Sequence, residues 1–66
     1  MQNSIRIERV RKRLTQQELA DILSVSRQTI MAIESGRFNP SVKLALKMAA
    51  LFECDVKDLF SLEDGD

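Results

Sequence analysis

The chain has no histidine, and it has only one cysteine and two glycines among its 66 residues. Transition-metal sites and Ser-His or Cys-His nucleophilic pairs therefore lose their usual side chains. Gly36 and Gly65 lie too far apart to build a glycine-rich phosphate loop. Cys54 has no second thiol, so we interpret it as a small, half-buried residue in preference to a redox sensor. These absences predict a protein that is not an enzyme and carries no metal or other cofactor.

Long apolar runs are also absent. No run approaches the roughly 20 residues needed to cross a bilayer, and the opening Met-Gln-Asn-Ser-Ile-Arg lacks the apolar stretch of a signal peptide. We therefore expect a cytoplasmic protein with no membrane partner. A chain of 66 residues has room for one domain, in which only about 60% of the unfolded surface can be buried. Its stability should be marginal unless a partner subunit contributes.

The formal net charge is zero, but the charges are unevenly distributed along the chain. Residues 1–13 carry a net charge of +4, residues 14–52 carry +1, and residues 53–66 carry −5. Such separation is typical of a domain with an electrostatic footprint on one side, as nucleic-acid-binding proteins have. A solvated basic helix beside a disordered acidic tail would produce the same numbers, so charge alone does not decide between the two.

The spacing of apolar residues predicts five helices and no strand, which is an all-α fold. We expect the helices at about residues 4–13, 15–23, 26–35, 41–52 and 56–60. The expected buried faces are Ile7, Val10 and Leu14 in the first helix, with Ile5 near its edge, and Leu19, Ala20, Ile22 and Leu23 in the second. The single domain spans residues 1–66, and residues 61–66 should fray as an acidic tail.

Capping residues support these boundaries. Thr15 and Glu18 have the spacing of a capping box, in which each side chain binds a free backbone N–H of the helix start. Ser26 and Ser41 can cap the two helices that follow them, and Gly36 can take the left-handed conformation that ends the third helix. Residues 15–36 therefore predict two short helices that are joined by a tight turn and cross at a large angle.

Residues 14–36 resemble the Cro/cI-type (Xre) helix-turn-helix family of phage and bacterial repressors. The similarity lies in Leu-Thr-Gln-Gln-Glu-Leu-Ala, Val-Ser-Arg-Gln-Thr-Ile and Ile-Glu-Ser-Gly, and it continues through Asn-Pro-Ser and the fourth helix to cover about residues 5–60. The resemblance implies a compact five-helix, lambda-repressor-like domain whose third helix lies in the major groove of DNA. Ser24 stands where many members have glycine, and a left-handed serine there would cost roughly 1 kcal/mol.

The third helix is, by this resemblance, the part that reads the bases. The residues at base-facing positions are Arg27, Gln28, Thr29 and Ala32. Arginine pairs bidentately with guanine and glutamine with adenine, each worth about 1–3 kcal/mol of discrimination, whereas an alanine methyl can at most touch a thymine methyl.

A second group of residues is implied to hold the DNA backbone. These residues are Gln16, at the start of the second helix, and Arg37, Phe38, Asn39 and Ser41. A helix start favours an anion, which suits phosphate at Gln16. Lys43 is a further phosphate candidate by its charge alone, although a solvated lysine explains it equally well.

The resemblance also pairs Arg9 with Glu34 in a salt bridge between the first helix and the end of the third. The role of this pair would be structural, because it would hold the recognition helix in orientation. If Arg9 pointed to solvent instead, it would join the other N-terminal basic residues in attracting phosphate. We favour the salt bridge.

The function that we expect is sequence-specific binding of double-stranded DNA by a transcriptional regulator, a repressor that binds a pseudo-palindromic operator as a homodimer. The expected dimer interface consists of the apolar residues Phe52, Leu59, Phe60 and Leu62. Control would come from concentration or from a regulatory protein partner. The alternative is an antitoxin-like protein-interaction module whose acidic C-terminal end binds another protein. A membrane-surface role for the first helix is disfavoured, because that helix is short and insufficiently apolar.

Overall fold

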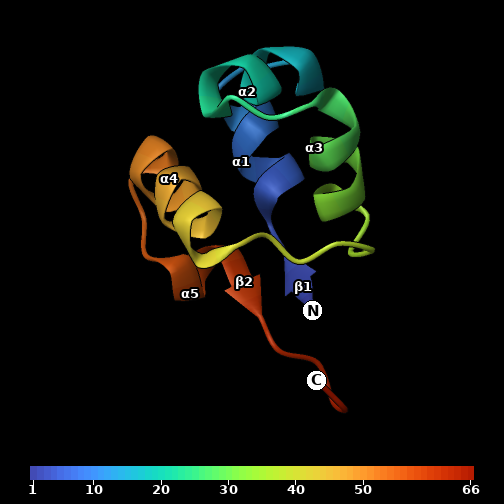
Figure 1. Cartoon of the computed structure of the whole chain (residues 1–66). Coiled ribbons are helices and arrows are strands. Elements are labelled where there is room, and N and C mark those ends of the chain that lie inside the picture. Colours follow the sequence, from blue (N-terminus) through green and yellow to red (C-terminus); the bar gives the residue numbers. More distant parts are fainter.

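The computed structural model describes residues 1–66 as five helices and two short strands. The helices are α1 (Ile5–Arg11), α2 (Gln16–Leu23), α3 (Arg27–Glu34), α4 (Val42–Phe52) and α5 (Val56–Leu59). The strands are β1 (Gln2–Asn3) and β2 (Phe60–Ser61), which pair antiparallel. In Figure 1, α1 lies between α3 and α4, α2 covers them at the top, and the strands lie at the base. All five expected helices are confirmed, whereas the two strands were not predicted.

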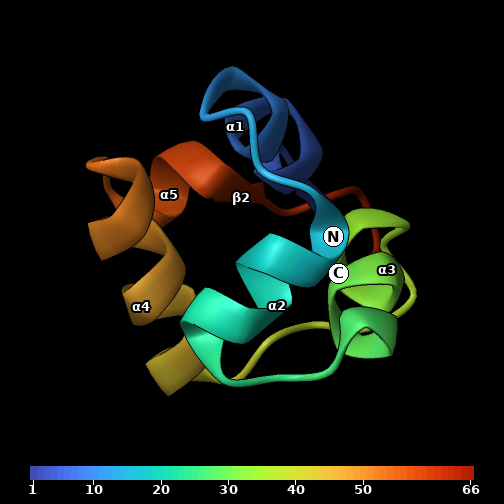
Figure 2. The same ribbon diagram turned by 90° about the horizontal axis from the view of Figure 1, so that it is seen from above.

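Local hydrogen bonds set the starts of α2 and α3. The Thr15 hydroxyl accepts from the Glu18 N–H at 3.0 Å and the Glu18 carboxylate accepts from the Thr15 N–H at 2.9 Å, which confirms the capping box. The Ser26 hydroxyl accepts from the Thr29 N–H at 3.1 Å and starts α3. Between the two helices, Ser24 adopts the left-handed conformation with φ of 59°. Seen from above, α2 lies between α4 and α3 (Figure 2).

Thirteen buried side chains form the core, and all of them are apolar. They are Ile5, Leu19, Ala20, Leu23, Ile30, Ile33, Leu44, Ala45, Met48, Ala49, Phe52, Leu59 and Phe60. Small Ala20 is fully buried in the α2–α3 part of this core, as expected for two helices that cross closely. None of the helices combines the length and the apolar character that crossing a membrane requires.

The buried face of α1 differs from the predicted one. Ile5 is completely buried, whereas Ile7 and Val10 are 62% and 57% exposed. The reason is that Ile5 and Arg9 lie one turn apart on the same side of α1, and Arg9 reaches Glu34 on α3. This contact turns the Ile7 and Val10 side of the helix outward. In α2, Ile22 is likewise exposed and does not join the core.

Three of the four residues expected at a dimer interface lie inside the single subunit. Phe52, Leu59 and Phe60 are buried in its core, and only Leu62 is exposed. The expectation that these four side chains form an interface is therefore wrong for the three that the core absorbs. The physical reason is that α5 folds back on α4 and β2 pairs with β1, so these residues already have partners within the chain.

The acidic tail also departs from the expected frayed segment. Its first residue, Ser61, belongs to β2, and the N-terminal amine of Met1 lies 3.1 Å from Asp66 and 3.7 Å from Glu63. The two chain ends thus lie side by side. The hydrogen bond to Asp66 raises the pKa of this amine, and the Glu63 N–H, followed by the amine, lowers the pKa of Asp66. Each shift favours the charged form of its group, so the pair should persist across neutral pH.

Replacing Ser24 with glycine tests the strain in the turn. We expect Ser24→Gly to raise the free energy of unfolding by up to about 1 kcal/mol, because glycine takes a left-handed conformation without a Cβ clash. Lys47→Gly on the exposed side of α4 is the control and should lower it by about 0.5–1 kcal/mol. Denaturant unfolding measures both changes. A loss of stability in Ser24→Gly as large as in the control would show that the turn is unstrained.

Candidate nucleic-acid interface

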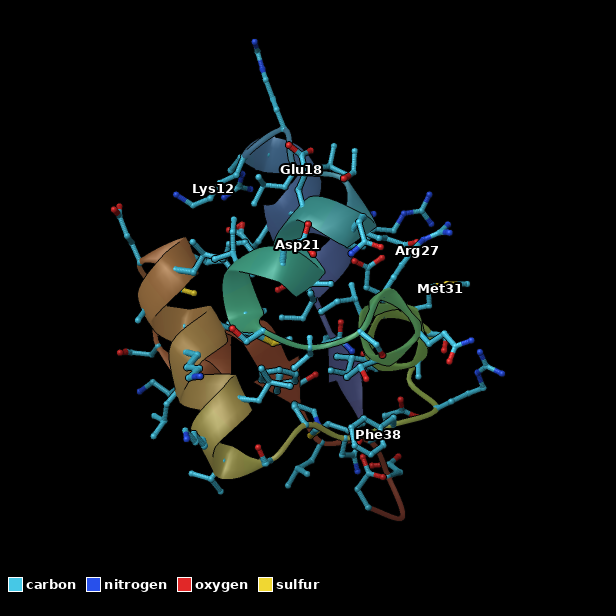
Figure 3. The ribbon with its side chains drawn as sticks, turned by 45° about the horizontal axis from the view of Figure 1, so that its top comes forward. Lys12, Glu18, Asp21, Arg27, Met31 and Phe38 are labelled. Atoms are coloured by element: carbon cyan, nitrogen blue, oxygen red, sulfur yellow. The ribbon has the colours of Figure 1, made fainter.

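The first turn of α3 presents two long polar side chains to solvent. Arg27 and Gln28 are both exposed. Arg27 and Met31, one turn further on, project from the same side of α3 and away from the body of the molecule (Figure 3). The opposite side of α3 is anchored by Ile30 and Ile33, which are completely buried. The helix therefore has one fixed face and one free face, as an element that enters a DNA groove requires.

The other two predicted base-reading residues are less accessible. Thr29 is half-buried, and its hydroxyl lies 3.0 Å from the Ser26 hydroxyl within the helix cap. Ala32 is half-buried as well. Its carbonyl accepts from the Ser35 hydroxyl and from the N–H groups of Arg37 and Phe38 at 3.0–3.2 Å. Thr29 and Ala32 thus border the exposed face of α3, and Arg27 and Gln28 form its polar part.

The loop after α3 carries four of the predicted backbone-binding residues. Gly36 has a φ of +81°, which confirms the left-handed end of α3. The chain then turns sharply, and the exposed residues of the loop and of the α4 cap are Arg37, Phe38, Asn39 and Ser41. The loop and Phe38 lie beside the end of α3 (Figure 3). They lie close enough to α3 to contact the DNA backbone beside a groove that α3 enters.

Gln16 begins α2, and Lys43 lies in the first turn of α4. The Gln16 amide donates to Glu34 Oε1 at 3.2 Å, which leaves its second N–H for another acceptor. Lys43 is exposed in the first turn of α4 and, with Lys47, lines a shallow cavity beside the turn at Ser24 and Val25. Both positions suit contacts with DNA phosphates.

Arg6 belongs to the same surface, although the sequence did not single it out. It is exposed on α1 and lines a concave surface of about 530 Å³ together with Gln16, Met31, Arg37 and the Arg9–Glu34 pair. Arg6 and Arg37 thus bring positive charge to this surface from α1 and from the loop after α3. The spacing of Arg6 could have indicated its position. Arg6 precedes Arg9 by three residues, so the two side chains are neighbours on the surface of α1.

The Arg9–Glu34 ion pair fixes the orientation of α3. Arg9 Nε donates to Glu34 Oε2 at 2.7 Å, and Nη2 donates to Oε1 at 3.3 Å. A third donor of Arg9, Nη1, binds the Leu14 carbonyl at 2.8 Å. The two side chains are 12% and 6% exposed. The pair therefore ties α1 and the segment before α2 to the last turn of α3, and the Gln16 amide adds α2 to the same carboxylate.

Cys54 lies half-buried outside this surface. Burial raises the pKa of its thiol, and the nearby carboxylates of Glu8, Asp58 and Asp55 raise it further. The thiol therefore stays protonated at neutral pH and is a weak nucleophile. It contributes nothing to the surface around α3.

A double-mutant cycle tests the structural role of the ion pair. We expect Arg9→Ala and Glu34→Ala each to cost about 3–5 kcal/mol of stability, because each leaves a largely buried charge unpaired. The double variant should lose clearly less than the sum of the two single losses. Denaturant unfolding of the three variants gives the coupling free energy. Purely additive losses would show that the two side chains do not stabilise each other.

Comparison with known proteins agrees with this architecture. A sequence model of the helix-turn-helix family matches residues 5–59. An uncharacterized HTH-type transcriptional regulator of Methanocaldococcus jannaschii is 47% identical over 66 residues, with both chains covered completely. The HTH-type transcriptional regulator YgzD of Bacillus subtilis is 39% identical, with 97% of each chain covered. The restriction-modification controller protein C.AhdI of Aeromonas hydrophila has a similar structure, with a TM-score of 0.74, 30% identity and 85% of each chain covered. The chain therefore belongs to the Cro/cI-type helix-turn-helix family of DNA-binding transcriptional regulators, with a lambda-repressor-like fold.

Proposed function

We propose that this chain is a cytoplasmic, sequence-specific repressor that binds a pseudo-palindromic operator as a homodimer. The observation that carries the proposal is the free polar face of α3, which the Arg9–Glu34 pair and the buried Ile30 and Ile33 hold rigidly. A rigid helix loses little conformational entropy when it enters the major groove. Repression then requires only that the protein occupies the operator and excludes other proteins from it.

Arg27 and Gln28 supply the main base contacts in this proposal. Both are exposed in the first turn of α3, where a recognition helix approaches the base edges. Arg27 suits the two acceptors of a guanine, and Gln28 suits the donor and acceptor of an adenine. Thr29 and Ala32 lie beside these contacts, and their short side chains suit smaller groups on the base edges.

Phosphate contacts surround the base-reading face. The groups that we assign to them are Gln16, Arg37, Phe38, Asn39, Ser41 and Lys43, together with Arg6. They lie on α1, α2, the loop after α3 and the start of α4, so they can reach the DNA backbone on both sides of the groove. Arg6, Arg37 and Lys43 add positive charge, which supplies affinity without regard to sequence. The Phe38 N–H is bound to the Ala32 carbonyl, so Phe38 contributes its exposed ring at the loop.

A second copy of the chain completes the operator-binding unit. One eight-residue helix reads few base pairs, so a useful site needs two half-sites about one DNA turn apart. Along α4, Val42, Leu46 and Ala50 form an exposed stripe with a spacing of four residues. An antiparallel α4 of a second copy would pack on the stripe, with the two Leu46 side chains at its centre and Val42 of each copy opposite Ala50 of the other, which is the self-complementarity that two-fold symmetry requires.

The antitoxin-like alternative has less support. Its acidic C-terminal end would have to be free to bind another protein. In the structure, Glu63 and Asp66 already contact the N-terminal amine of the same chain. This exposed contact competes only weakly with a partner, and the similar proteins are named as transcriptional regulators, which favours the DNA-binding function.

Alanine substitution separates base reading from phosphate binding. We expect Arg27→Ala and Gln28→Ala each to cost about 1–3 kcal/mol of affinity for an operator selected from a random pool, and to leave thermal unfolding unchanged because both side chains are exposed. Fluorescence anisotropy with operator and random duplexes measures the difference. Equal losses on the two duplexes would show that these residues do not read sequence.

The matched control for this experiment is Arg37→Ala. It should weaken binding to operator and random DNA alike and should reduce the slope of log affinity against log salt by about one. Lys57→Ala, on α5 and distant from α3 (Figure 1), should change neither affinity nor slope.

The α4 stripe is tested by two substitutions of equal exposure. Leu46 on α4 and Val10 on α1 are both 57% exposed, so an aspartate at either position should leave the fold intact. We expect Leu46→Asp to dissociate the homodimer, because it buries a charge at the centre of the contact, and Val10→Asp to leave it associated. Sedimentation velocity measures the association. Dissociation by Val10→Asp alone would place the contact on α1, and a wild-type chain that is monomeric at all concentrations would exclude the homodimer.

A further inference from the structure

Met31 is an apolar side chain on the face of α3 that otherwise presents polar groups. It is 40% exposed, and it projects beside Arg27 away from the rest of the molecule (Figure 3). It takes no part in the core, to which α3 contributes Ile30 and Ile33. Packing within the subunit therefore does not account for a long apolar side chain at this position.

The surroundings of Met31 form a shallow cavity with an apolar part and a polar rim. Gln28, Met31, Ala32 and Arg37 line it. Ala32 offers only its methyl group there, because its carbonyl is already bound by Ser35, Arg37 and Phe38. Arg37 is held beside the cavity by a 3.2 Å hydrogen bond from its Nε to the Ser35 hydroxyl. The cavity therefore places a thioether and a methyl next to an amide and a guanidinium.

Only one base-edge group in the major groove is apolar, the methyl at C5 of thymine. A methyl that leaves water for the space between Met31 and Ala32 gains hydrophobic stabilisation, and the polarizable thioether adapts to its shape. Gln28 lies three and four residues before these two side chains, so it lies on the same face of α3. Its amide can pair with an adenine while the methyl of a nearby thymine enters the cavity.

We propose that Met31 and Ala32 form a methyl-binding site that reads one thymine of each half-site through its 5-methyl group. This inference rests on the proposed function, since it requires α3 to lie in the major groove. It adds an apolar specificity determinant to the polar contacts of Arg27 and Gln28. Met31 is the residue that sets the preference, because it is the larger and more exposed of the two.

Deoxyuridine provides the test, since it differs from thymidine only by lacking the methyl. An operator is first selected from a random duplex pool with the full chain, and each thymine is then replaced singly by deoxyuridine. We expect one thymine position in each half-site to be sensitive. A single replacement at that position should weaken binding about fourfold, as the loss of one buried methyl predicts. For Met31→Ala the affinities for the thymine and uracil duplexes should become equal. Ile7→Ala, which removes an exposed apolar side chain from the outer side of α1, should keep the fourfold difference.

Three outcomes would overturn the proposal. Equal binding of wild type to every uracil duplex would show that no methyl is read. A difference that persists in Met31→Ala, with unchanged thermal unfolding, would assign the methyl contact to another side chain. Selected half-sites without a common thymine would exclude the site while leaving sequence-specific binding intact. Failure of the proposed function gives a different result, because the pool would then yield no preferred sequence.

Discussion

The ion pair between Arg9 and Glu34 is the contact on which the DNA-binding surface depends. It joins side chains 25 residues apart, and further hydrogen bonds extend it to the Leu14 carbonyl and the Gln16 amide. A largely buried pair of this kind tolerates few geometries, because any displacement leaves a charge without a partner. The orientation of α3 relative to α1 and α2 is therefore fixed before DNA is present. The same contact decides which side of α1 faces the core.

Helix positions could be predicted from the sequence because their determinants are local. The capping box of Thr15 and Glu18, the caps at Ser26 and Ser41, and Gly36 act within one turn of the residues that they cap. Features that depend on distant contacts were missed. The two-residue strands have no periodicity to detect, and the exposure of Ile7 and Val10 follows from a partner on α3.

For the DNA-binding surface, too, some residues could be predicted from the sequence and others could not. Arg27 and Gln28 could be proposed for base contacts because the family resemblance places them at base-facing positions and their side chains have the chemistry of such contacts. Arg6 and Met31 acquire a meaning only when α1, α3 and the loop at Arg37 are seen to share one surface. The helix-turn-helix motif covers only α2 and α3, so it does not reveal the residues that α1 and the loop at Arg37 add to the surface.

The small core has a consequence for the life of the protein in a cell. Thirteen apolar side chains hold the fold together, and a domain of this size is only marginally stable. A ligand that binds only the folded state adds stability by mass action, about 2.7 kcal/mol at a hundredfold excess over Kd. Proteases that degrade transiently unfolded chains would thus remove unbound molecules faster than molecules on DNA. The turnover of the protein would then follow the occupancy of its own binding sites.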